Sequence, residues 1–233
     1  MGDSFELFSS PHLIALGVIL VFNIAFIRVC IRIREHNHIH LRHGLAIAIL
    51  LNEISWHLWT IVTGGWSIQT MLPLHLCSVM NYVSIATLLT KSPILYQLCY
   101  FLGIGGAIQA LLTPDLRQYG YPHFLFFQTF ISHGLLITTA LYMTVIEKYQ
   151  PSLRSLPTML IGFNVYLFFV AIVNALIGSN YLFISHKPEI PTLLDAMPPW
   201  PWYILGMEIV GIVVVLFLYL SFVFLNGIKK YLK

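Results

Sequence analysis

Apolar residues are grouped along this chain in seven long segments, separated by short stretches rich in charge, glycine and proline. Each segment approaches the roughly 20 residues that a helix needs to cross a bilayer. The pattern predicts an all-α, polytopic membrane protein, a bundle of seven transmembrane helices forming one integral membrane domain over residues 1–233. The predicted helices lie near 11–33, 43–63, 73–90, 94–112, 123–146, 157–177 and 201–226.

The basic residues fall almost entirely between alternate segments. Of the twelve lysines and arginines, only Arg117 and Lys187 lie on one predicted side. The other ten lie on the opposite side: Arg28, Arg32, Arg34, Arg42, Lys91, Lys148, Arg154, Lys229, Lys230 and Lys233. Cytoplasmic loops carry the basic excess, so we expect the N-terminus outside and the C-terminus in the cytoplasm. If the polar third segment did not cross, the basic residues would divide six and six.

Composition supports a membrane protein. The chain is 58% hydrophobic and only 9% charged, whereas a soluble domain carries about 25% charged residues. The net charge of +3 comes from residues beside helix ends, so it does not indicate a nucleic-acid partner. We expect a monomer in the cell membrane (a bacterial plasma membrane), with a membrane lipid as partner and no cofactor. The acidic N-terminus predicts a retained first helix rather than a cleaved signal peptide.

Polar side chains inside the apolar segments gather in the half of the bundle predicted to face outside. Such residues are costly in a bilayer and usually face the bundle interior or a wet cavity. Glu53 and His57 are four apart and share one helix face. They are interpreted either as a structural pair or as a proton-transfer pair. Glu208 has no partner close in sequence, and we expect it to pair across helices.

Cys77 is the best candidate for a nucleophile. We expect it in the first turns of a helix that opens at Pro73, where free N–H groups and the helix dipole favour a thiolate. His75 is only two residues away, so a base must come from another helix, and His133 lies at a compatible depth. A Cys–His pair supports acyl transfer. The alternative is that Cys77 is a packing residue. Cys30 and Cys99 have no polar neighbours in sequence and are interpreted as packing residues.

Other polar residues near the outer ends of the helices are candidates for binding a lipid head group or a developing oxyanion. They are His75, Gln109, Thr113, Asp115, Asn174, Asn180, Lys187, Asp195 and Trp200. Trp200 also suits an interfacial aromatic belt. No metal site is expected, since His75 and Cys77 are poorly spaced as ligands on one helix.

The proline-rich segment before the last helix is predicted to fold over the outer mouth of the bundle as a lid. Its apolar Leu193, Leu194 and Met197 would pack inward. Lys187 would either meet a lipid phosphate or pair with Asp115 or Asp195.

Several blocks carry a family resemblance: LPLHLCSV, GIGGAIQALLTPDL, FFQTFISHG, NYLFISHKP and LLDAMPPWPWY, which lie between Leu72 and Tyr203. In this order they resemble the YwaF family of bacterial integral membrane proteins. That family is similar to eukaryotic transmembrane protein 164, a cysteine-dependent phospholipid acyltransferase. The resemblance implies a seven-helix acyltransferase fold, with the nucleophile at Cys77 and its partner histidine at His133.

We therefore predict an intramembrane, lipid-acting enzyme, a Cys/His-dependent phospholipid acyltransferase or lipid ester hydrolase with its pocket in the outer half of the bundle. Two alternatives remain open. One is a non-enzymatic small-molecule transporter or receptor-like sensor, in which the polar residues form a binding pocket. The other is a structural partner subunit. Topology alone does not separate them.

Overall fold

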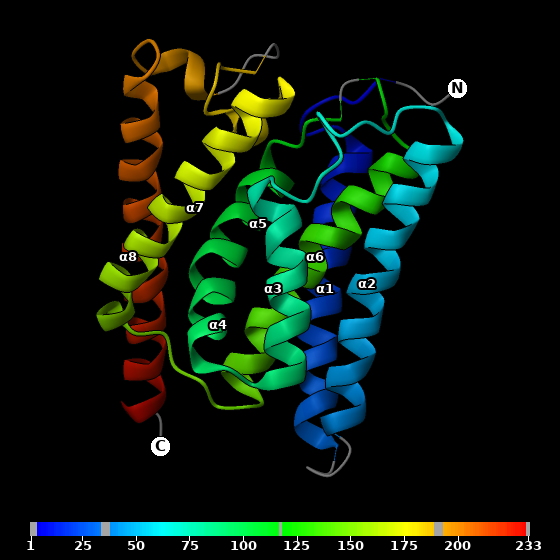
Figure 1. Ribbon diagram of the computed structural model, residues 1–233. Helices are drawn as coiled ribbons and strands as arrows, with labels where there is room; N and C mark the ends of the chain where they lie inside the picture. The colour runs from blue at the N-terminus through cyan, green and yellow to red at the C-terminus, as the bar shows by residue number, and fades with distance from the viewer. Residues whose placement is uncertain (1–3, 34–37, 117, 189–192, 232–233) are drawn as a thin grey trace.

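The computed structural model describes residues 4–33, 38–116, 118–188 and 193–231, and regular structure in these ranges is entirely helical. Seven helical rods run between the two ends of the bundle (Figure 1). They are α1 Ser10–Arg32, α2 His38–Val62, α3 Leu76–Thr90, the rod formed by α4 Pro93–Leu98, the π-helical η2 Cys99–Gly103 and α5 Ile104–Leu112, then α6 Phe124–Val145, η3 Leu153–Ser155 with α7 Leu156–Ile177, and α8 Trp202–Tyr231. Arg34, Arg117 and Lys233 lie outside the described residues, as do the side chains of Lys229 and Lys230.

Six of the seven rods are long and apolar enough to cross a membrane, and the seventh, α3, is a shorter apolar helix. Large apolar side chains cover their outward faces, with Phe168 on α7 70% exposed and Phe217 on α8 68% exposed. The predicted class, an all-helical multi-pass membrane protein, is confirmed. The start of α1 and the end of α8 lie at opposite ends of the bundle (Figure 1). We call the end where α1 begins the outer end and the opposite one the inner end, after the predicted orientation.

Three helix boundaries differ from those predicted by three residues or more, and one of them is the end of α8, at Tyr231 rather than 226. Helix α3 begins at Leu76 rather than 73. Pro73 lies before it, in a tight turn where the Leu74 N–H donates to the Leu72 carbonyl at 2.7 Å. Helix α2 begins at His38, five residues before the predicted 43. Its first residue is held by tertiary contacts that no local pattern reveals: the His38 ring is 3.2 Å from the Cys30 carbonyl oxygen, and Tyr142 Oη donates to the His38 carbonyl at 3.0 Å.

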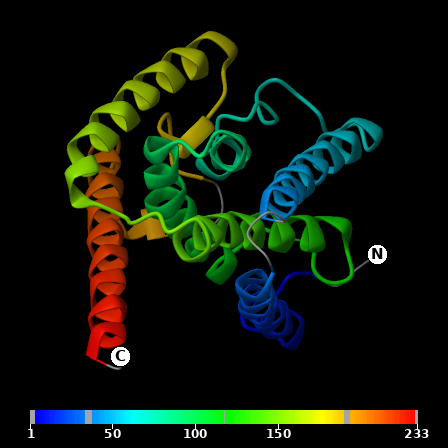
Figure 2. The ribbon, with the colours of Figure 1, turned by 90° about the horizontal axis from the view of Figure 1, so that it is seen from below.

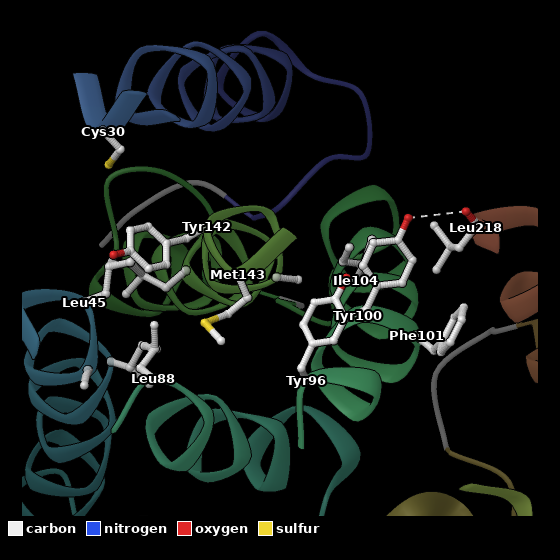
Figure 3. Packing of buried hydrophobic residues seen from close by; sticks show 14 of the residues in the cluster. Cys30, Leu45, Leu88, Tyr96, Tyr100, Phe101, Ile104, Tyr142, Met143 and Leu218 are labelled. Atoms are coloured by element: carbon white, nitrogen blue, oxygen red, sulfur yellow. Dashed lines mark hydrogen bonds between the residues drawn. The ribbon is translucent and has the colours of Figure 1, made fainter. Parts of the chain in front are cut away.

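Helix α6 is the centre of the bundle and contacts α1, α2, α3, η2 and α5 (Figure 2). The main core surrounds its inner half, where Tyr142 and Met143 are fully buried. Helices α7 and α8 lie at one side, where α8 meets η2 and α5. The Tyr100 hydroxyl of η2 donates to the Leu218 carbonyl of α8 at 3.3 Å and ties that side to the core (Figure 3).

Small residues on α5 allow close helix approach. A methyl group on Gly105 would lie 2.8 Å from Val214 Cγ1 of α8, too close for any side chain. A methyl group on Gly106 would meet α3 at ordinary contact distance. Helix α5 therefore fits between α8 and the start of α3, and this positions the candidate site.

Candidate functional site around Cys77

Cys77 is the second residue of α3, directly after the helix start at the outer end. The N-cap residue, His75, makes no side-chain capping bond. The first helical hydrogen bond runs from Val79 N to the His75 carbonyl at 3.0 Å. Within the described ranges, no acceptor is found for the N–H groups of Leu76, Cys77 and Ser78. The first turn of α3 therefore presents free donors and the positive end of the helix dipole next to the thiol.

The Cys77 side chain is partly exposed and faces α5. Its sulfur would lie 3.7 Å from a methyl group on Gly106, so the absence of a side chain there leaves room beside the thiol. Cys77 also packs against Met80, Ala107 and Leu136, a cluster that joins α3, α5 and α6. The thiol makes no hydrogen bond to any residue that the structure describes.

His133 lies on α6, one turn before Leu136 of the cluster that Cys77 contacts. Its Nδ1 is 2.7 Å from the Thr129 carbonyl oxygen. Because a carbonyl only accepts, Nδ1 must carry a proton, and in the neutral ring the lone pair is then on Nε2. That is the form a general base needs. No hydrogen bond between His133 and Cys77 is found among the described residues, and their pairing stays a prediction.

The segment that leads into α3 is held by side chains from α7 and from η4 Tyr181–Phe183. The buried Tyr181 hydroxyl donates to the Ile68 carbonyl at 2.7 Å and accepts from Leu72 N at 2.8 Å. Burial raises the pKa of the Tyr181 phenol, so the hydroxyl stays protonated. Tyr166 Oη donates to the Leu74 carbonyl at 2.8 Å. These tyrosines fix the backbone on which Cys77 sits, and no local sequence signal identified them.

The His75 side chain connects the start of α3 to η4. Its ring packs against Tyr181 and Phe183, with ring centroids 5.2 and 5.3 Å away. The Leu182 N–H donates to Nδ1 at 3.4 Å. Since Nδ1 accepts, the proton of the neutral ring is on Nε2, which makes His75 a hydrogen-bond donor two residues before Cys77.

A model of the TMEM164 family matches residues 7–219, nearly the whole chain. The chain belongs to the TMEM164 family. The predicted kinship with transmembrane protein 164 is confirmed, and the match extends beyond the blocks between Leu72 and Tyr203 that carried the resemblance. The match does not show membership of the YwaF family.

An uncharacterized protein of Treponema pallidum (strain Nichols) is 28% identical over 142 residues, which are 61% of this chain and 59% of that protein. The chain therefore spans about three fifths of the length of the curated relative it matches. No solved structure matches the chain.

In this TMEM164-family protein, the side chains of Asn174 and Asn180 form hydrogen bonds within the loop between α7 and α8, which we call the outer loop. Asn174 is buried, with Nδ2 donating to the Tyr181 carbonyl at 3.0 Å and Oδ1 accepting from Ser179 Oγ at 2.7 Å. Asn180 Nδ2 donates to the His186 carbonyl at 2.8 Å, and its Oδ1 accepts from Ser185 N at 3.1 Å. Both amides therefore make hydrogen bonds within the loop, and a role in substrate binding stays a prediction.

The outer loop also holds Lys187, Asp195 and Trp200. Lys187 Nζ donates to the Met197 carbonyl at 2.9 Å, and Trp200 Nε1 donates to the Ile184 carbonyl at 3.0 Å. Asp195 lies exposed in η5 Leu193–Ala196. The half-buried Met197 reaches α8, where its sulfur would be 3.1 Å from a methyl group on Gly206. Residues 189–192 and the Leu193 side chain lie outside the described residues, and the lid stays a prediction.

Gln109, Thr113 and Asp115 are exposed at the end of α5 and just beyond it. Thr113 Oγ1 donates to the Gln109 carbonyl at 3.0 Å and closes the last turn. A role of these three residues in substrate binding stays a prediction. Within the described ranges, no group of three or more histidine, cysteine, aspartate or glutamate side chains is arranged to hold a metal ion.

Cys99 has polar neighbours in the folded protein, although none is close to it in sequence. Thr87 Oγ1 lies 3.2 Å from its sulfur and Ser84 Oγ lies 3.6 Å away. Both come from the facing helix α3, so a search for polar neighbours along the sequence could not find them. Cys99 is fully buried and joins η2 to α3.

Proposed function

We propose that this TMEM164-family protein acts on an acyl ester of a membrane lipid, with Cys77 as nucleophile and His133 as general base. The observation that carries the proposal is the position of the Cys77 thiol. It lies partly exposed in the first turn of a helix with free N–H groups, and its sulfur is 3.7 Å from the position that a methyl group on Gly106 would occupy. A membrane-embedded site of this kind suits a lipid ester as acyl donor.

The first step forms a thioester on Cys77. His133 Nε2 takes the thiol proton while the sulfur attacks the ester carbonyl carbon, and a tetrahedral oxyanion forms. The ester C–O bond then breaks, and His133 returns the proton to the leaving lipid oxygen. In the second step His133 removes a proton from a lysolipid hydroxyl or from water, whose oxygen attacks the thioester. The thiol is regenerated, and the product is a new ester or a free fatty acid.

Backbone donors suit the oxyanion better than the amides predicted from the sequence. The N–H groups of Cys77 and Ser78 lie on the attacking residue and its neighbour, whereas Asn174 and Asn180 are engaged elsewhere. The Nε2–H of His75 is a further donor close in sequence. Fixed donors at a developing oxyanion are commonly the largest electrostatic contribution to acyl-transfer catalysis.

The test is acyl transfer by the purified protein in phospholipid vesicles. The vesicles contain a phospholipid with a labelled acyl chain and an unlabelled lysophospholipid, and mass spectrometry follows label in new phospholipid and in free fatty acid. We expect turnover by the wild type, none by Cys77→Ala, and a loss of about 100-fold or more for His133→Ala. A labelled acyl adduct on the protein, absent from Cys77→Ala, identifies the thioester.

Cys30→Ala is the matched control, because Cys30 is fully buried on α1. It should retain wild-type turnover. Full activity of folded Cys77→Ala contradicts a cysteine nucleophile. Ser132, which directly precedes His133 on α6, is the alternative nucleophile. Turnover that survives in Cys77→Ala but disappears in Ser132→Ala contradicts the cysteine mechanism and supports a serine nucleophile.

A further inference from the structure

Arg42 is a buried cation at the inner end of the bundle. It lies near the start of α2 and is 7% exposed. The buried residues Leu45, Ala46 and Ile49 follow it at helical spacing, so Arg42 is on the core-facing side of α2. A role in topology alone does not require this burial, since Arg28 and Arg32 at the end of α1 carry the same charge on partly or fully exposed positions.

The protein leaves much of this guanidinium group without hydrogen bonds. Arg42 Nε and Nη1 are buried, and no acceptor within hydrogen-bond distance is found in the part of the chain that the structure describes. The carboxylate of Glu147 at this end is paired with Lys91 at 2.6 Å and lies 3.5 Å from the Tyr142 hydroxyl. Burying a charge without a partner is costly. An anionic ligand removes that cost.

The surroundings of Arg42 favour an anion. Long side chains on a helix point back toward its N-terminus, so Arg42 is directed to the first turn of the 25-residue α2. The positive end of the helix dipole makes such a start attractive to phosphate. Tyr142 and His38 join α6 to this turn, and His38 contacts Cys30 of α1. Figure 3 shows Tyr142 beside Leu45 of α2, facing Leu88 of α3.

We propose that Arg42 and the start of α2 bind a phosphate group, supplied either by the head group of an anionic lipid in the adjoining leaflet or by free phosphate. The planar guanidinium donates two parallel hydrogen bonds to phosphate oxygens, for which arginine is suited better than lysine. The site lies at the end of the bundle opposite Cys77 and does not depend on the proposed acyl chemistry.

The test uses the full-length protein in a zwitterionic detergent, with thermal unfolding followed by intrinsic tryptophan fluorescence. Phosphatidylglycerol, phosphatidylcholine and inorganic phosphate are titrated separately. We expect phosphatidylglycerol or phosphate, but not phosphatidylcholine, to raise the unfolding midpoint of the wild type. Protection by phosphatidylglycerol alone identifies a lipid head group, and protection by both identifies a site for free phosphate. Arg42→Gln should weaken the binding about tenfold or more.

Arg32→Gln is the matched control, since Arg32 is exposed at the end of α1, and it should keep the protection. If Arg42→Gln does not fold, Arg42→Lys is compared with the wild type by native mass spectrometry, and a lower retained amount of phosphatidylglycerol supports the site. Equal protection of the wild type and Arg42→Gln overturns the proposal. A second result also overturns the proposal. In it, Glu35→Gln destabilises the ligand-free protein as much as Arg42→Gln does, and the double variant is no less stable than either single variant. Glu35 would then be the partner of Arg42.

Discussion

The amide nitrogen of Asn81 lies 2.9 Å from the carboxylate of Glu53 and so ties α3 to α2 inside the bundle. The same nitrogen donates to Ser132 Oγ of α6 at 3.1 Å. One amide therefore joins three helices, one turn beyond Cys77 and beside the residue that precedes His133. His57 Nε2 is farther from Glu53, at 3.8 Å. Glu53 therefore has a hydrogen-bond partner on another helix, in addition to its neighbour His57 on the same helix.

Replacing Asn81 should destabilise the bundle. Asn81→Ala leaves a buried carboxylate and a buried hydroxyl without their shared donor, which costs about 1–3 kcal/mol. We expect a lower thermal midpoint and faster loss of folded protein on heating in detergent. Asn164→Ala is the control, because Asn164 is exposed and, among the described residues, its side chain bonds only the Leu160 carbonyl of its own helix. Equal midpoints for the two variants would contradict a bridging role.

Two adjacent glycines of α5 should respond differently to alanine. Gly105→Ala places a methyl group 2.8 Å from Val214 Cγ1, whose β-branched side chain has little freedom to move. It should destabilise the protein by about 1–3 kcal/mol. Gly106→Ala meets its nearest neighbour, Leu76, at 3.5 Å and should be nearly neutral. Thermal unfolding of both variants checks the order, and a reversed order would show that α5 is rotated from the position described.

Cys77 should be the first cysteine to react with a small maleimide in the folded protein. It is partly exposed, whereas Cys30 and Cys99 are 0% exposed. Intact mass should show one rapid addition to the wild type and none to Cys77→Ala over the same period. Denaturation should make all three thiols reactive. Rapid labelling of Cys77→Ala at native conditions would place an accessible thiol elsewhere.

The two termini should lie on opposite sides of the membrane. The start of α1 and the end of α8 lie at opposite ends of the bundle (Figure 1). The basic residues predict that the N-terminus is outside. An N-terminal epitope tag should bind antibody on intact cells, and a C-terminal tag only after permeabilisation. Antibody access to both tags on intact cells would exclude this arrangement.

Much of the fold was predictable because hydropathy is a local property. Windows of apolar residues located the spans, and the structure places helices at each of them. The helix starts were less predictable. His38 begins α2 because Tyr142, 104 residues away, bonds its carbonyl. Leu76, rather than Pro73, begins α3 because the preceding turn is pinned by Tyr181, which lies 109 residues from Leu72.

The sequence by itself determined the membrane class, the order of the helices and the residues on which acyl chemistry is proposed. The tertiary structure decided which polar side chains are available for it. Asn174 and Asn180 have the polar side chains expected of ligand-binding residues, yet both donate hydrogen bonds to backbone carbonyls of the loop between α7 and α8. Arg42 resembles the other basic residues in sequence, yet it is buried, and two of its nitrogens have no acceptor among the residues that the structure describes. The reason is physical: hydrophobicity acts through local windows, whereas a hydrogen-bond partner depends on how each helix is rotated against distant neighbours.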